Sequence, residues 1–139
     1  MAQFKTPTQA DFDKFSTIEE KMLFFLNDTV KYYSENVKRR ASDGTACNYR
    51  MDKKACAIGR YLKKDVADYL DAQYGAGISK FYGILPPILK QFGASFLASI
   101  QTLHDRGQYW DKNGLTEAGV FKLSELKKDF NLNSLELAK

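Results

Sequence analysis

The sequence is poor in the side chains on which covalent catalysis and metal binding depend. Its 139 residues include two cysteines, one histidine and one tryptophan. A structural zinc ion takes four Cys, His or carboxylate ligands, arranged as close pairs, whereas Cys47 and Cys56 lie nine positions apart. Two cysteines are also too few for a disulfide scaffold, which favours a reducing compartment. We therefore expect no metal and no cofactor.

Long apolar runs are absent as well. The sequence begins without the apolar run of a signal peptide, and no stretch approaches the ~20 apolar residues that cross a membrane. The hydrophobic share of 44% and the charged share of 27% are typical of a globular chain large enough to bury a core. We expect a cytoplasmic protein without membrane contact. In it, residues 1–15 form a loosely attached arm and residues 16–139 a single globular domain.

The single histidine, His104, limits the catalytic hypotheses. A thiol nucleophile needs a base and a group that orients the base, for which the sequence offers a cysteine, His104 and Asp105. Neighbouring residues of a helix project about 100° apart, so Asp105 is poorly placed to orient His104. His104 lies on the edge of an apolar stripe, which favours a packing role, and Trp110 is best explained as an aromatic lid on the core. A cysteine- or metal-dependent enzyme is therefore the least favoured interpretation.

Apolar residues that recur at spacings of three and four predict helices near both ends of the chain. The capping-box spacing of Ser16 and Glu19 predicts the start of a helix at about 17–38. A last helix is expected to begin after Thr116, which is a suitable N-cap residue. Its predicted buried face consists of Val120, Leu123, Leu126 and Phe130.

The strongest apolar stripe predicts a central helix at about 85–105. Pro86 and Pro87 suit its first turn, where proline loses no hydrogen bond that the helix needs. Another helix is expected to follow Gly59, with Asp65 at its start. The predicted fold is α+β and predominantly helical, with about four helices packed around the central helix and one short hairpin.

The hairpin is predicted at about 46–58, where residues alternate with a period of two. Cys47, Tyr49 and Met51 alternate with polar residues before a turn signal. A turn centred between residues 52 and 53 pairs Tyr49 with Cys56 and leaves the two cysteines diagonal, ~7–8 Å apart. Since a disulfide needs a Cα spacing of about 5.5–6 Å, we expect two free, buried thiols.

The net charge of +4 comes entirely from one short segment. Residues 1–49 hold seven basic and seven acidic residues, and residues 66–139 hold eight of each. Residues 50–65, which we call the basic segment, hold six basic residues against Asp52 and Asp65. A local positive field of this kind attracts phosphates, nucleic acids or acidic protein surfaces. The six candidate anion-binding residues are Arg50, Lys53, Lys54, Arg60, Lys63 and Lys64.

Arg50 and Arg60 are the strongest candidates within the basic segment. The strand alternation directs Arg50 away from Tyr49 and Met51, and its planar fork can grip a phosphate or a carboxylate through two hydrogen bonds. Arg60 follows Gly59 and is expected to complete the site from the helix side. A hairpin tip projects from its support, so these charges are expected to be accessible.

Two short motifs and a distant group of residues form a recognisable pattern. These motif residues are Cys47, Tyr49 and Arg50, then Cys56 and Gly59, and far downstream His104, Asp105 and Trp110. The pattern resembles a family of small phage- and prophage-encoded proteins with a Cys-x-Tyr-Arg strand, a Cys-Ala-Ile/Val-Gly segment and a helix that ends in His-Asp. The match covers about residues 44–130 and departs from the family at the shorter turn and at Ala55, where a lysine is expected. The resemblance implies a phage-type accessory protein in the host cytoplasm and implies no chemistry.

Taken together, these features favour a non-enzymatic protein that binds an anionic partner. The partner is expected to be a host factor with an acidic surface or a nucleotide, which the protein would inhibit or sequester, as an anti-defence protein does. The alternative is a nucleic-acid-binding module, whose affinity would fall log-linearly with salt concentration. The sequence leaves the oligomeric state open.

Overall fold

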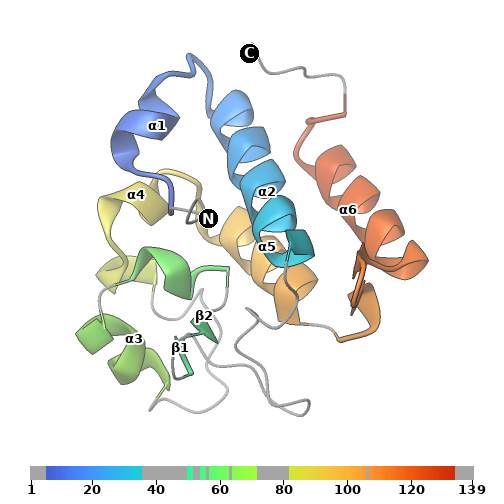
Figure 1. The fold of residues 1–139 in the computed structure, drawn as a ribbon. Helices are drawn as coiled ribbons and strands as arrows, with labels where there is room; N and C mark the ends of the chain where they lie inside the picture. Colours follow the sequence, from blue (N-terminus) through green and yellow to red (C-terminus); the bar gives the residue numbers. More distant parts are fainter. Residues whose placement is uncertain are drawn as a thin grey trace.

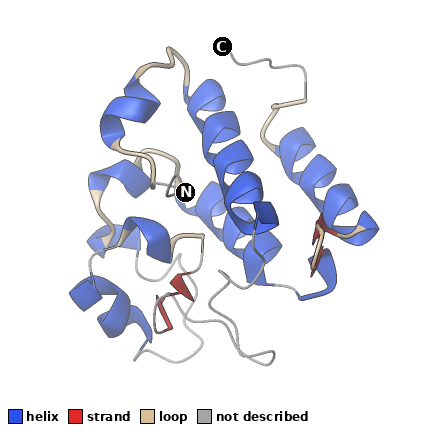
Figure 2. Ribbon diagram, viewed as in Figure 1, coloured by secondary structure: helices blue, strands red, loops and turns tan. Residues whose placement is uncertain are grey.

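The computed structural model describes residues 6–35, 50–51, 54–55, 57–62, 64–71, 82–105 and 107–133. Over these residues the chain is mostly helical, with two short antiparallel hairpins (Figures 1 and 2). This confirms a predominantly helical α+β fold. The helices are α1 (Gln9–Asp13), α2 (Ile18–Glu35), η2 (Gly59–Tyr61), α3 (Lys64–Asp71), α4 (Pro87–Lys90), α5 (Ala94–Asp105), η4 (Gly107–Tyr109) and α6 (Glu117–Asp129). The strands are β1 (Arg50–Met51), β2 (Lys54–Ala55), β3 (Trp110–Asp111) and β4 (Gly114–Leu115).

The N-terminal residues of the described chain are packed rather than loosely attached, so this expectation is wrong for residues 6–15. Thr8 and Asp11 form a capping box at the start of α1. Phe12 of α1 has no solvent exposure, and its ring centroid lies 5.2 Å from that of Phe92. The buried ring holds α1 on the core.

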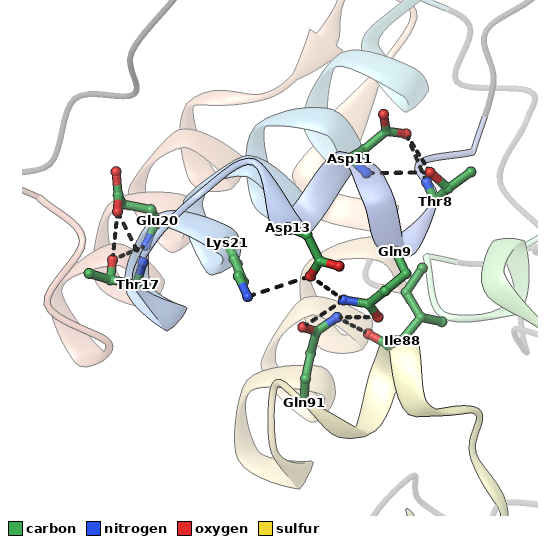
Figure 3. A network of polar contacts seen from close by, with 9 residues as sticks. All are labelled: Thr8, Gln9, Asp11, Asp13, Thr17, Glu20, Lys21, Ile88 and Gln91. Atoms are coloured by element: carbon green, nitrogen blue, oxygen red, sulfur yellow. Dashed lines mark hydrogen bonds and ion pairs between the residues drawn. The ribbon is translucent and has the colours of Figure 1, made fainter.

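A polar network also ties α1 to its neighbours (Figure 3). Gln9 and Gln91 exchange hydrogen bonds of 3.2 and 3.3 Å between their side-chain amides. Asp13 accepts a hydrogen bond from Gln9 at 2.8 Å and forms an ion pair with Lys21 of α2 at 3.8 Å. The side chains reach each other across the turn between α1 and α2, next to α4. Since these groups are exposed, the network positions α1 more than it stabilises it.

Helix α2 uses a capping box one residue later than the sequence predicted. Thr17 Oγ1 accepts a hydrogen bond from the Glu20 backbone N–H, and Glu20 Oε1 accepts one from the Thr17 N–H, both at 3.1 Å. The pair is therefore Thr17 and Glu20, not Ser16 and Glu19. The predicted end of this helix near residue 38 lies outside the described residues.

The predicted central helix is in fact two helices, α4 and α5. Pro86 is the N-cap of α4 and Pro87 lies in its first turn, as expected. Gly93 then adopts φ +82°, a left-handed conformation that interrupts an α-helix and that glycine adopts without strain. Helix α5 begins at the next residue. The apolar stripe is continuous in sequence, but the helix that carries it is broken.

Helix α5 forms the centre of the core. Phe96, Leu97, Ile100 and Leu103 have no solvent exposure. The Phe96 ring contacts α2 through Phe25, at a centroid distance of 6.0 Å, and contacts Phe130 at the end of α6, at 5.1 Å. Helices α2, α5 and α6 run alongside one another in Figure 1. Within the described residues, no helix is long and apolar enough to cross a membrane.

The sequence did not predict the hairpin of β3 and β4. Its register pairs Trp110 with Leu115, and the turn precedes Gly114, which adopts φ +111°. Trp110 is 6% exposed and its Nε1 donates a hydrogen bond to the Leu103 carbonyl at 2.8 Å. The prediction that Trp110 covers the core is confirmed.

Helix α6 packs against η4 at one glycine. A Cβ on Gly119 would lie 2.3 Å from the Tyr109 carbonyl oxygen, so a larger residue would separate the two elements. Thr116 is the N-cap, as predicted, and accepts a hydrogen bond from the Gly119 N–H at 3.1 Å. Leu126 is buried on the same side, but Val120 is 53% exposed. The prediction that Val120 faces the core is wrong, because the buried side of α6 is centred on Gly119 and Leu126.

Removing the Phe96 ring tests the assignment of α5 as the core helix. Phe96→Ala should lower the free energy of unfolding by about 3–5 kcal/mol, because it leaves a cavity between α2, α5 and α6. The matched control, Phe121→Ala, removes a ring that is 66% exposed and should change it by about 0.5 kcal/mol or less. Chemical denaturation of both variants in dilute solution gives the comparison. Equal losses would show that Phe96 is not the core residue described here.

Candidate functional site

The backbone of the basic segment confirms the predicted hairpin register. Arg50 pairs with Ala55 and Met51 pairs with Lys54, which places a two-residue connection at positions 52 and 53. This is the register in which Tyr49 would face Cys56. Cys47, Tyr49 and Cys56 lie outside the described residues, so the free thiols stay a prediction.

Apolar side chains hold the basic segment on the core. Ala57 and Ile58 follow the hairpin and are fully buried, and Leu62 is 3% exposed after η2. Ala67 of α3 is also fully buried, and α3 contacts β1. The segment therefore forms a folded unit with α3, in which Gly59 begins η2 and is itself buried.

Arg60 contradicts the expectation that the charges of this segment are accessible. Its side chain is 2% exposed, and its Nη1 donates a hydrogen bond to Asp28 Oδ2 at 2.8 Å. The guanidinium carbon lies 3.8 Å from the centroid of the Tyr32 ring. Asp28 and Tyr32 are four residues apart on α2, so one face of that helix supplies both contacts. Arg60 connects the basic segment to α2 and does not project into solvent.

Burial dominates the electrostatics around Arg60. The desolvation of Asp28 raises the pKa of its carboxyl group above the ordinary value of 3.8, although the Arg60 guanidinium acts in the opposite direction. Burial and the nearby Asp28 also raise the pKa of the Tyr61 hydroxyl well above its usual range. That hydroxyl has no hydrogen-bond partner within the described part of the chain. Because removal from water offsets the attraction within a buried ion pair, such a pair fixes geometry more than it adds net stability.

For the other candidate anion-binding residues, the structure describes the backbone of three and leaves two outside the described residues. Arg50 lies in β1, Lys54 lies in β2 and Lys64 begins α3, so the structure brings their backbones into one folded unit. Lys53 and Lys63 lie outside the described residues. Asp65 is exposed in the first turn of α3, where its carboxylate caps the Val66 N–H at 2.9 Å.

The pairing of Arg60 changes the charge of the segment. With Arg60 offset by Asp28, five basic residues remain against two acidic residues, a net charge of +3. Helix α3 adds Asp68 and Asp71 to the same unit, which reduces the field further. The excess positive charge is therefore smaller than the sequence suggested, and the basic residues that remain to account for it are those of the hairpin together with Lys63 and Lys64.

His104 and Trp110 lie in the core, away from the basic segment in sequence. His104 has no solvent exposure and its ring meets that of Tyr33 edge to face, with centroids 4.8 Å apart. His104 is thus surrounded by core side chains, as the predicted packing role requires. Asp105 ends α5. Among the residues that the structure describes, no three His, Cys, Asp or Glu side chains gather as metal ligands.

Sequence reasoning missed Asp28 and Tyr32. The signal was present, because Asp28 lies three residues after buried Phe25 and Tyr32 lies four residues further along the same face. A carboxylate on an apolar helix face needs a cationic partner, but the neighbouring sequence does not indicate which residue provides it. Comparison of the chain with protein-family models, with curated proteins and with solved structures gives no match.

A double-mutant cycle tests the role of the Arg60–Asp28 pair. Arg60→Met should lower the free energy of unfolding by about 3–5 kcal/mol, because it leaves a buried carboxylate without its ion pair. Asp28→Leu should have a similar effect. The double variant should lose clearly less than the sum of the two, since a well-packed apolar pair restores the balance. Additive losses in urea denaturation would contradict the coupling.

The pH dependence of stability tests the electrostatics of Asp28. A folded-state pKa above the unfolded value means that the native state binds the proton more tightly. The contribution of Asp28 to the free energy of unfolding is therefore fully present at a pH below 3.8, the ordinary pKa of the carboxyl group. It is lost as the pH rises through the raised pKa of the folded state. The free energy of unfolding of the wild type, relative to that of Asp28→Asn, should fall with pH above about 4 and then level off. A relative free energy that instead rises with pH would mean that Arg60 outweighs burial.

Proposed function

We propose that this chain is a non-enzymatic binding protein that recognises an anionic partner through the basic segment. The observation that carries the proposal is the concentration of the whole net charge in residues 50–65, where Arg60 is paired with Asp28. Positive charge without matching carboxylates attracts an anionic surface and speeds its association. The proposal rests on the remaining five basic residues.

The charge balance elsewhere supports this reading. Lys14, Lys21 and Lys122 each lie within 3.8 Å of a carboxylate, on Asp11, Asp13 and Glu125. These are surface pairs, and each contributes little to stability. These three lysines outside the basic segment have local carboxylate partners, whereas the segment holds six basic residues against two carboxylates of its own.

The buried anchors support the proposal in a second way. Ile58, Leu62 and Arg60 fix the segment to the core from one side. A loop that is held in place loses less conformational entropy when it binds, so the same charges give more affinity. The part of Arg60 in binding is therefore to position the segment, and the contacts to the partner come from its neighbours.

The resemblance to phage-encoded proteins suggests the biological setting of the proposal. A phage-type accessory protein in the host cytoplasm would use such a surface to block a host factor with an acidic surface or to sequester a nucleotide. A nucleic-acid-binding module is the alternative. Its distinguishing property is a steep, log-linear loss of affinity with rising salt concentration.

The test compares two sets of charge removals in the full chain. The triple variant Arg50→Ala, Lys53→Ala and Lys54→Ala removes the charges of the hairpin and spares Arg60. It should weaken binding more than tenfold, and a melting temperature close to that of the wild type would show that the loss of binding is not a loss of folding. Fluorescence anisotropy with a labelled oligonucleotide, with a labelled ATP analogue and with a labelled polyglutamate peptide provides the affinities.

The matched control is the triple variant Lys14→Ala, Lys112→Ala and Lys127→Ala, which removes the same charge from other surfaces. It should bind as the wild type does. If the control loses as much affinity as the hairpin variant, net charge alone is responsible and the proposed site is wrong. A salt slope that falls by about one per lysine removed, with the oligonucleotide only, would favour the nucleic-acid alternative.

A further inference from the structure

Helix α6 exposes two large hydrophobic side chains. Phe121 is 66% exposed and Val120 is 53% exposed, although both are large hydrophobic residues. Beside Phe121 the surface is hollowed, and the hollow is lined by Tyr109, Glu117, Ala118, Lys122 and Glu125 in addition to Phe121. Val120 and Phe121 project about 100° apart on the helix, so the candidate contact point is Phe121 with the hollow beside it rather than a continuous apolar patch. The face that carries Phe121 lies on the side of α6 opposite Gly119, which packs against η4.

Four exposed residues form one straight stripe along this face. Glu117, Phe121, Ser124 and Lys128 are all exposed, and their spacing is four, three and four residues. On an α-helix this spacing keeps side chains in a narrow band, as in the seam of a coiled coil. The stripe carries a negative charge at its N-terminal end, a large ring and a small side chain in the middle, and a positive charge at its C-terminal end.

If a second copy of this stripe runs antiparallel to the first, each residue meets a complementary one. We propose that a second copy of the chain binds this face through an antiparallel, two-fold contact between the two α6 helices. In that register Glu117 of each copy meets Lys128 of the other, and Phe121 meets Ser124, whose small side chain leaves room for the ring. A two-fold contact uses the same patch on both copies, so each pairing occurs twice.

The charge pattern favours a second copy of the chain as the partner, and it favours this register of the two helices. If the two helices were centred on Phe121 instead, Glu117 would face Glu125, and like charges would oppose association. The register centred between Lys122 and Leu123 replaces that repulsion with two ion pairs. A single pair of helices buries less area than a standard interface, so the dimer is expected to be weak.

Charge reversal tests the register. Glu117→Lys and Lys128→Glu each place like charges opposite each other in a homodimer, so each variant alone should self-associate at least tenfold more weakly than the wild type. Mixed in equal amounts, the two variants should associate again to within about threefold of the wild type, because both cross pairs then have opposite signs. Sedimentation equilibrium over a concentration series measures all three samples.

The controls separate this contact from other causes of association. Lys127→Glu makes the same charge change one residue away, off the stripe, and should leave self-association unchanged. Phe121→Ser should weaken it at least tenfold. A wild type that is monomeric at all concentrations overturns the proposal, and so does an equal mixture that associates no better than either charge variant alone. Rescue in the mixture also shows that both charge variants are folded.

Discussion

The ring of Phe25 is the contact on which most of the structure depends. It has no solvent exposure, and its centroid lies 4.9 Å from that of Tyr61, 5.0 Å from Phe92, 5.9 Å from Phe12 and 6.0 Å from Phe96. These partners come from η2, the α4–α5 junction, α1 and α5, so one side chain of α2 joins four separate parts of the chain. Aromatic rings are large enough to bridge such elements, and two of these contacts are edge to face, an arrangement that rings favour.

Helix α2 also contributes to a buried ion pair close to Phe25, between Asp28 and Arg60. Asp28 and Tyr32 fix Arg60 between a carboxylate and a ring, and Tyr61 follows Arg60 directly into the aromatic cluster. The apolar and ionic contacts therefore position the same short helix, η2, and with it the start of α3. Residues 57–62, which lie within the basic segment, are therefore held by contacts that are themselves buried. Because Arg60 is held in this way, we assign it a positioning role and not a contact with the partner.

Features that depend on a few neighbouring residues could be predicted from the sequence. Features that depend on contacts between distant parts of the chain could not. The hairpin register followed from alternation around a two-residue connection, and the Thr116 cap followed from its residue type. Gly93 could not be predicted as a break, because an uninterrupted apolar stripe passes through it, and Phe12 could not be predicted as buried, because its partners lie in other elements. The prediction of the candidate site was incomplete for the same reason. The charges of residues 50–65 were evident, but the burial of Arg60 depends on Asp28, 32 residues earlier.

The approach of Gly119 to the Tyr109 carbonyl has a consequence for how this chain can diverge. Alanine is the best helix former and glycine among the worst, so drift within a helix ordinarily removes glycine. Here any side chain would push α6 away from η4 and from the Trp110 hairpin that η4 leads into. Relatives that keep this junction are therefore expected to keep glycine three positions after the capping threonine, whatever else they exchange. Such a pair is a marker by which distant members of the lineage can be recognised when overall similarity has been lost.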